Sequence, residues 1–100
     1  VRRKAELAAQ ALARLVSVRA ASLFGSHVEG APDGWSDIDV AGFVDDLEAW
    51  TPEQQTRMIV TVQRELGFDV EPHLFPASAM EHPIPGSLAA HILRRGLRIS

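Results

Sequence analysis

Two apolar runs separated by a short segment rich in glycine constrain the fold of this chain most strongly. The first run, residues 20–24, stops at Gly25 and is typical of a buried strand. The second, residues 37–44 (DIDVAGFV), alternates at first and then becomes continuously apolar. The segment 30–35 between them holds glycine, proline and aspartate, which are loop residues. We therefore expect both runs to be strands, the second with one end open to a site.

A first helix is expected before these strands. Residues 3–18 are rich in alanine, leucine and arginine, all strong helix formers. The spacing of the larger side chains predicts one apolar face, consisting of Leu7, Ala11, Leu15 and Val18.

The clearest helix follows the second strand. Thr51 is a good N-cap, Gln54 occupies the capping-box position, and Gly67 ends the helix. The expected buried stripe consists of Met58, Ile59, Val62 and Leu66.

The remaining segments complete an α-β-β-α-β-α-β order. Residues 68–75 alternate as a strand that carries Pro72, which suggests an edge position or a bulge. Its two faces are Phe68, Val70 and Leu74 on one side, and Asp69, Glu71 and His73 on the other. A short helix over 87–95 and a final strand over 97–99 follow. We therefore predict one α/β (α+β) domain over residues 1–100, with a small mixed sheet flanked by helices.

Composition excludes several classes of function. The net charge of -3 argues against a broad basic surface for nucleic acid, so direct nucleic-acid binding is not expected. The absence of cysteine excludes disulfides, thiolate catalysis and cysteine-ligated zinc. Charge or glycine interrupts every apolar stretch, and the N-terminal segment is amphipathic, so we expect no membrane span, no signal peptide and a cytoplasmic protein. Because the first residue is Val1, we expect a few residues to precede it.

The acidic pair Asp37 and Asp39 is the first chemical feature. Residues two apart on a strand project from the same face, and two neighbouring carboxylates repel each other unless a cation lies between them. Carboxylate oxygens of this kind suit Mg²⁺, an ion that also binds the phosphates of a substrate. Gly25 and Ser26 follow the first strand, where glycine lets the backbone approach a phosphate closely and the serine hydroxyl can bind its oxygens.

These residues resemble the signature of a known family. The run LFGSHVEGAPDGWSDIDV is similar to that of the DNA polymerase β-like nucleotidyltransferases, and most of all to the minimal nucleotidyltransferases. Short members of that group read Gly-Ser-x-x-x-Gly, five residues, then Ser-Asp-Ile-Asp. The matching positions here are Gly25, Ser26, Gly30, Ser36, Asp37 and Asp39. The convincing part of the resemblance covers residues 20–44.

The resemblance implies a polymerase β-like core and a metal-dependent transfer of a nucleoside monophosphate, AMP from ATP in the leading expectation, to a hydroxyl. Two Mg²⁺ ions would be held by Asp37, Asp39 and a third carboxylate from the next strand. Glu71 is favoured for that role, with Asp69 as the alternative. Gly25 and Ser26 would position the β- and γ-phosphates, with Ser36 part of the same nucleotide-binding motif.

The resemblance also implies a partner protein. Minimal nucleotidyltransferases often serve as antitoxins beside HEPN-domain toxins, and some adenylylate a tyrosine of that toxin. The alternative is a catalytically degenerate module that binds and regulates a partner. One departure favours the alternative, because many relatives carry arginines in the loop where this chain has His27 and Glu29.

Overall fold

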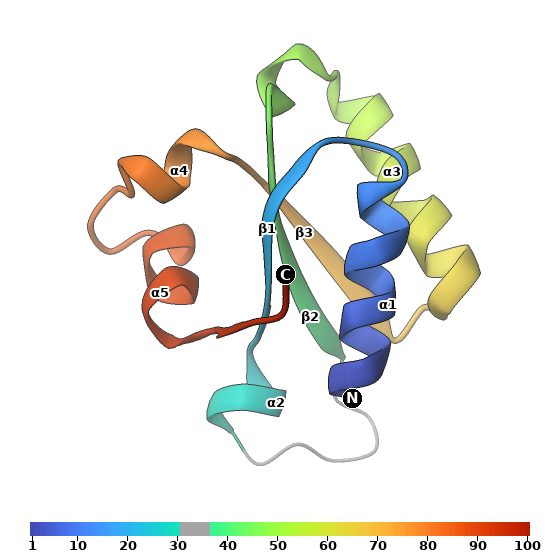
Figure 1. Cartoon of the computed structure of the whole chain (residues 1–100), viewed down its shortest axis with the longest axis horizontal. Helices are drawn as coiled ribbons and strands as arrows, with labels where there is room; N and C mark the ends of the chain where they lie inside the picture. The colour runs from blue at the N-terminus through green and yellow to red at the C-terminus, as the bar shows by residue number, and fades with distance from the viewer. Residues whose placement is uncertain (31–36) are drawn as a thin grey trace.

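A four-stranded mixed sheet organises the computed structural model, which describes residues 1–30 and 37–100 (Figure 1). The strands are β1 (Val18–Phe24), β2 (Ile38–Val44), β3 (Val70–Pro76) and β4 (Leu97–Arg98). Their order is β3-β2-β1-β4; β1 pairs antiparallel with β2 and β4, whereas β2 and β3 are parallel. The expected small mixed sheet flanked by helices is confirmed.

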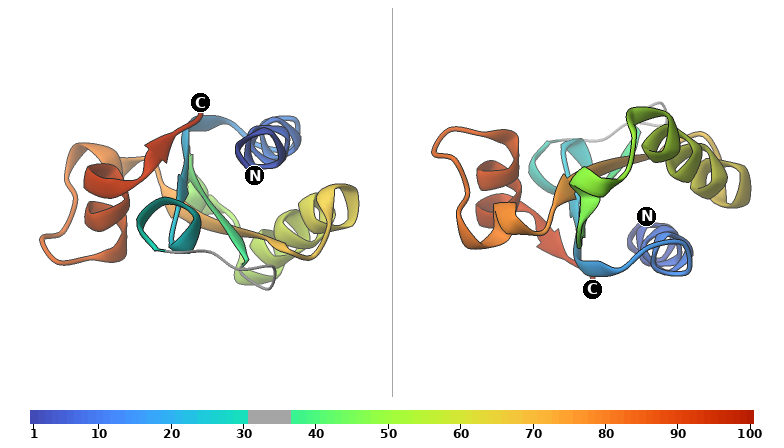
Figure 2. Two further views of the ribbon diagram at one scale, coloured as in Figure 1. Left: turned by 90° about the horizontal axis from the view of Figure 1, so that it is seen from below. Right: turned by 90° about the horizontal axis from the view of Figure 1, so that it is seen from above.

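Helices cover both faces of this sheet. They are α1 (Arg2–Ala13), α2 (Ser26–Glu29), α3 (Pro52–Leu66), α4 (Ser78–Glu81) and α5 (Leu88–Arg95), with a 3₁₀ turn η1 (Leu47–Ala49). Figure 2 shows α1 and α3 against one face and α4 and α5 against the other. Among the described residues, no helix combines the length and apolar composition that crossing a membrane requires.

Each face of the sheet has its own core, because successive side chains of a strand point to opposite faces. Val40 and Val44 of β2 pack with buried residues of α1 and α3. Ala41 and Phe43 pack instead with Ala89 and other buried residues on the α4–α5 face. The strand β2 is therefore buried on both sides along most of its length.

The first helix differs from its prediction in length and in the face that it buries. It ends at Ala13, and Val18 already pairs with Val44 in the sheet. Its buried residues are Ala5, Ala8, Ala9, Ala11 and Leu12, whereas the predicted face member Leu15 is 41% exposed. The helix packs closely on the sheet at Gly42, where an added Cβ would lie 2.6 Å from Leu12. The absence of a side chain at Gly42 therefore leaves room for Leu12 on the buried face of α1.

The prediction for α3 is confirmed in its bounds and its cap. The Thr51 hydroxyl accepts a hydrogen bond from the Gln54 backbone N–H, and the Gln54 side chain accepts one from the Thr51 N–H. Met58 and Val62 are buried against the sheet, with Ile59 and Leu66 half-buried beside them.

The strand β3 begins later than predicted. Residues 67–69 form a turn closed by a hydrogen bond from the Val70 N–H to the Gly67 carbonyl, with Gly67 at φ +117°. The predicted core residue Phe68 lies in this turn and is 68% exposed. The predicted edge position is confirmed, since β3 pairs with β2 at one end of the strand order.

Candidate functional site

The register of three strands places Asp39 between β1 and β3. Asp39 lies opposite Phe24, the last residue of β1, and beside Glu71 in the parallel pairing with β3. Because paired residues of neighbouring strands project their side chains to the same face, the carboxylates of Asp39 and Glu71 lie side by side. The sequence prediction that residues of these two strands meet therefore holds for Asp39 and Glu71.

Gly25 brings the backbone after β1 against the Asp39 carboxylate. Its φ is +82°, and a Cβ added there would lie 2.5 Å from Asp39 Oδ2. Few residues other than glycine adopt this backbone conformation, and any side chain would displace Asp39. The expected approach of the Gly-Ser turn to the acidic strand is thus present in the structure.

The second glycine of the motif has a related role. The short helix α2 begins at Ser26, and the Gly30 N–H donates to the Ser26 carbonyl at 3.1 Å. A Cβ on Gly30 would lie 3.3 Å from Ser26 Cα, which is tighter than an ordinary contact. The spacing Gly-Ser-x-x-x-Gly therefore corresponds to a single tight turn of backbone. The predicted nucleotide-binding residue Ser36 lies outside the described residues.

His73 joins the two carboxylates, from the strand position two residues after Glu71. Its Nε2 lies 3.1 Å from Asp39 Oδ1 and 3.9 Å from Glu71 Oε1. Its ring packs edge to face with the ring of Phe24, with centroids 5.0 Å apart and planes at 68°. Strand alternation in the sequence already places His73 on the face of Glu71, although the sequence alone favours a surface position over zinc binding for each histidine. The approach of His73 to Asp39 depends on the β2–β3 register, which has no local signal.

Two of the predicted carboxylates stand apart from these side chains. Asp37 is exposed and lies one residue before β2, outside the group that Asp39 forms with Glu71 and His73. Asp69 lies in the turn before β3, and Lys4 Nζ of α1 binds both its oxygens at 2.7 and 2.9 Å. This hydrogen bond from Lys4 holds the pKa of Asp69 below its usual value. Asp69 therefore does not share a strand face with Glu71, and its carboxylate is bound by Lys4.

The donor set fits a divalent cation. Within residues 1–30 and 37–100, one group of three side chains brings its possible ligand atoms within 4.8 Å of one another: Asp39, Glu71 and His73. Asp39 and His73 are largely covered, with side-chain exposures of 23% and 29%, whereas Glu71 is 49% exposed. A half-covered set of two carboxylates and an imidazole can hold a metal ion and still leave room for an outside ligand.

The charge of Glu29 in the Gly-Ser turn is compensated by the last helix. His91 Nε2 lies 2.7 Å from one Glu29 oxygen, and Arg95 Nε lies 3.8 Å from the other. These contacts join α2 to α5. Glu29 therefore brings a cationic side chain of α5, that of Arg95, next to the turn.

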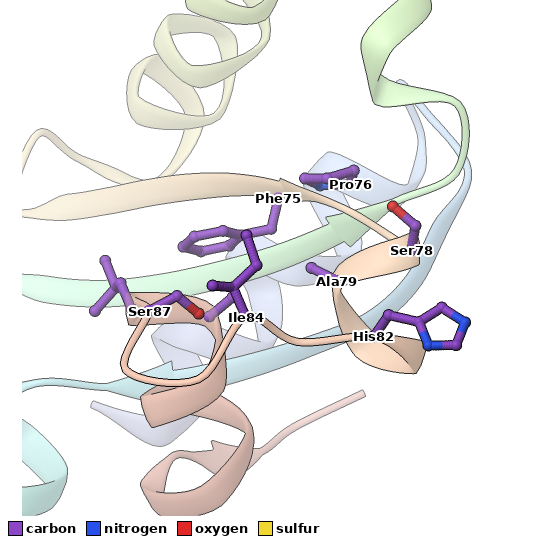
Figure 3. Close-up of a pocket in the computed structure, with 9 residues that line it drawn as sticks. Phe75, Pro76, Ser78, Ala79, His82, Ile84 and Ser87 are labelled. Carbon is purple, nitrogen blue, oxygen red and sulfur yellow. The ribbon is translucent and has the colours of Figure 1, made fainter.

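A separate apolar pocket lies on the same face of the sheet, further along β3 (Figure 3). Its volume is about 380 Å³, and it is lined by Phe75 at the end of β3 and by residues of α4 and α5. Phe75 shares a strand face with Glu71 and His73, but neither of those two side chains lines the pocket. The pocket is thus a neighbour of the acidic group and not part of it.

No protein-family model matches the chain, and the search among curated proteins also found no match. The functional interpretation therefore depends on the motif and on the geometry of the residues around Asp39.

Proposed function

We propose that this chain is a metal-dependent nucleotidyltransferase that transfers AMP from ATP to a hydroxyl group. One observation carries the proposal: the Gly25 turn, Asp39 and Glu71 lie together at the end of β1. Gly25 and Asp39 are part of the spacing that resembles the minimal nucleotidyltransferases, and Glu71 is the favoured third carboxylate that the resemblance implies. A phosphate-binding turn and metal-binding carboxylates are each common, whereas their contact at this spacing is the arrangement that nucleotidyl transfer needs.

The roles of the residues follow from their positions. Asp39 and Glu71 would hold Mg²⁺, with Asp37 as the further ligand that the resemblance implies. Mg²⁺ supplies neutralisation of phosphate charge when bound there. The Gly25 backbone and the Ser26 hydroxyl would bind the phosphates beyond the α-phosphorus. We keep Ser36 as a proposed nucleotide-binding residue.

The reaction forms one bond and breaks one. The oxygen of the acceptor hydroxyl bonds to the α-phosphorus of ATP, and the bond from that phosphorus to the bridging oxygen breaks, releasing pyrophosphate. The hydroxyl proton passes to the carboxylate of Glu71, which is exposed enough to return it to water. Asp39, covered and held beside Gly25, would fix the position of the bound metal and nucleotide.

We further propose that a partner protein supplies the acceptor hydroxyl. The resemblance favours a HEPN-type toxin, whose tyrosine would receive the AMP, with this chain as its antitoxin. A reaction that uses ATP also agrees with the cytoplasmic location expected from the sequence.

Incubating the chain with ATP, Mg²⁺ and the product of the adjacent gene tests this function. We expect mass spectrometry to find one added AMP on the partner. Glu71→Gln should abolish the addition, whereas Asp69→Asn, the matched control, should preserve it. The proposal is wrong if no AMP is added, or if Glu71→Gln transfers as well as the wild type.

One observation favours the alternative of a non-catalytic module that regulates a partner by contact. Asp37 is exposed and stands outside the group formed by Asp39, Glu71 and His73. Calorimetry distinguishes the two functions, because a degenerate site should release no Mg²⁺-dependent heat with ATP.

A further inference from the structure

His73 places a ring nitrogen beside the carboxylates of Asp39 and Glu71, and this contact needs an explanation. A neutral imidazole presents one bare nitrogen, and a carboxylate oxygen is also an acceptor. His73 Nε2 and Asp39 Oδ1 lie 3.1 Å apart, so either a proton carried by Nε2 or a cation must lie between these two atoms. The contact is therefore either a hydrogen bond or one edge of a metal site.

The distances suit a metal ion. Two ligand atoms each about 2.1 Å from one ion, and at right angles, are separated by about 3.0 Å. The observed 3.1 Å between His73 Nε2 and Asp39 Oδ1 agrees with that separation, and the 3.9 Å to Glu71 Oε1 needs only a small side-chain rotation. Glu71 can make this rotation, because its side chain is half exposed.

The surroundings hold the imidazole in this position. The His73 ring packs in a T-shaped arrangement with the ring of Phe24, which is buried. On the other side of Asp39, the second oxygen, Oδ2, faces the backbone of Gly25. Asp39 thus turns Oδ1 toward His73 and Glu71, so that all three side chains point to one place.

The chemistry of the donors decides which ion fits. Mg²⁺ prefers oxygen ligands only, whereas imidazole nitrogen suits borderline ions such as Co²⁺, Fe²⁺ and Zn²⁺. We propose that His73 is a metal ligand, and that Asp39, Glu71 and His73 together bind a divalent transition-metal ion more tightly than Mg²⁺. The inference rests on the metal-ligating role that the proposed function gives to Asp39 and Glu71, and does not depend on the transfer reaction.

The competing explanation is that His73 only positions Asp39 by donating a hydrogen bond. A positioning histidine would keep its nitrogen protonated toward the carboxylate and would never contact the ion. The two roles predict different spectra for a Co²⁺-loaded protein. A ring bound to paramagnetic Co²⁺ through Nε2 shows its Nδ1 proton as a strongly shifted, solvent-exchangeable resonance, and a ring outside the coordination sphere does not.

The experiment titrates the metal-free chain with Co²⁺ and, separately, with Mg²⁺, and records proton NMR spectra of the Co²⁺ complex. His73→Ala is compared with His82→Ala, which removes an exposed histidine away from the group. We expect His73→Ala to lower Co²⁺ affinity by about tenfold or more and Mg²⁺ affinity by less than about threefold. The exchangeable resonance should be present in the wild type and in His82→Ala, and absent in His73→Ala. Circular dichroism checks the fold, and His73→Gln replaces His73→Ala if the latter fails to fold.

Two results would overturn the inference: a Co²⁺ complex without the exchangeable resonance, or a His73→Ala variant that binds Co²⁺ as tightly as the wild type. Its failure is distinguishable from failure of the proposed function. AMP transfer by a protein whose Co²⁺ complex lacks the resonance would contradict this inference alone. A protein that shows the resonance but transfers no AMP with any metal would contradict only the transferase function.

Discussion

At the scale of single residues, Gly25 and Asp39 depend on each other. The backbone at Gly25 has φ +82° and ψ -150°, a region that residues with a side chain rarely enter. The same position faces Asp39 Oδ2 so closely that a methyl group would have to displace the carboxylate. The geometry of the site therefore depends on the missing side chain of Gly25 as much as on the carboxylate of Asp39.

Gly25→Ala should therefore weaken metal-dependent ATP binding by about tenfold or more, because it moves a carboxylate that would hold the ion. Gly86→Ala is the matched control: Gly86 also has positive φ, at +80°, but an added Cβ there meets nothing within 4 Å. Both variants should lose about 1–3 kcal/mol of unfolding free energy through backbone strain. Equal ATP affinity for Gly25→Ala and the wild type, measured by calorimetry, would contradict this account of Gly25.

Asp69 should contribute to stability and not to the site. Its pKa is lowered chiefly by the hydrogen bond from Lys4, so the ionised form stabilises the folded state at neutral pH. That contribution is present above the ordinary carboxyl pKa and is lost as the pH falls through the lowered pKa of the folded protein. Because the pair is exposed, we expect Asp69→Asn to cost less than about 1 kcal/mol near pH 7 and nothing in strong acid. Urea unfolding at both pH values measures the difference. A larger loss of unfolding free energy in acid than near pH 7 would contradict a stabilising role for the ionised carboxylate.

At the scale of elements, α3 stabilises the fold from the face opposite the site. Its capping box joins Thr51 and Gln54 through two hydrogen bonds of 2.8 and 3.1 Å. The helix packs through Met58 and Val62 on the side of the sheet shared with α1. A change at this cap should alter stability without reaching Asp39.

Thr51→Ala should lower the unfolding free energy by about 1 kcal/mol, because the N–H of Gln54 loses its acceptor. Thr56→Ala in the same helix is the control. The Thr56 hydroxyl donates to the Pro52 carbonyl within the exposed helix, so its loss should change stability by less than about 0.5 kcal/mol. Metal binding should be the same in both variants. A cost for Thr51→Ala no larger than that for Thr56→Ala would mean that the cap contributes little.

The same elements show how far the sequence could predict the fold. The helix α3 was predictable because its start, its end and its buried face all have local signals in the chain. In α1 the predicted face was partly wrong, because the helix buries Leu12, whose side chain packs on Gly42, together with nearby alanines, and only the sheet reveals that. For β3, glycine at 67 ends α3 and also begins a turn, so the strand starts two residues after Phe68.

The candidate site was predictable in part for a similar reason. Spacing along the chain relates Gly25, Ser26 and Asp39, because the motif lies within one strand–turn–strand unit. The choice between Asp69 and Glu71 depends on strand register, and the approach of His73 to Asp39 depends on the β2–β3 pairing. Neither the register nor the pairing has a local signal.

At the scale of the whole molecule, the site occupies one end of a face whose remainder is packed by α4 and α5. Phe43 of β2 stacks on Phe75 of β3 with ring centroids 5.5 Å apart, and both belong to the core on that face. Glu29 connects the Gly-Ser turn to α5 through His91. The geometry of the site therefore depends on this second, smaller core.

Phe43→Ala should lower the unfolding free energy by about 3–5 kcal/mol, since its side chain is completely buried. For a domain of ordinary stability this is a large fraction of the total, about 5–15 kcal/mol. Phe68→Ala removes a phenylalanine that is 68% exposed and should cost far less. Equal urea midpoints for the two variants would contradict the assignment of the core on the α4–α5 face.

The central claim, that the Gly25 turn and the carboxylate of Asp39 form one metal–nucleotide site, is tested most directly by calorimetry of ATP binding to the wild type and to Asp39→Asn. Asparagine keeps the size of the side chain but removes its charge, so the fold should be preserved. We predict Mg²⁺-dependent heat for the wild type and none for Asp39→Asn at the same concentrations. Equal heats for the two folded proteins would contradict the claim.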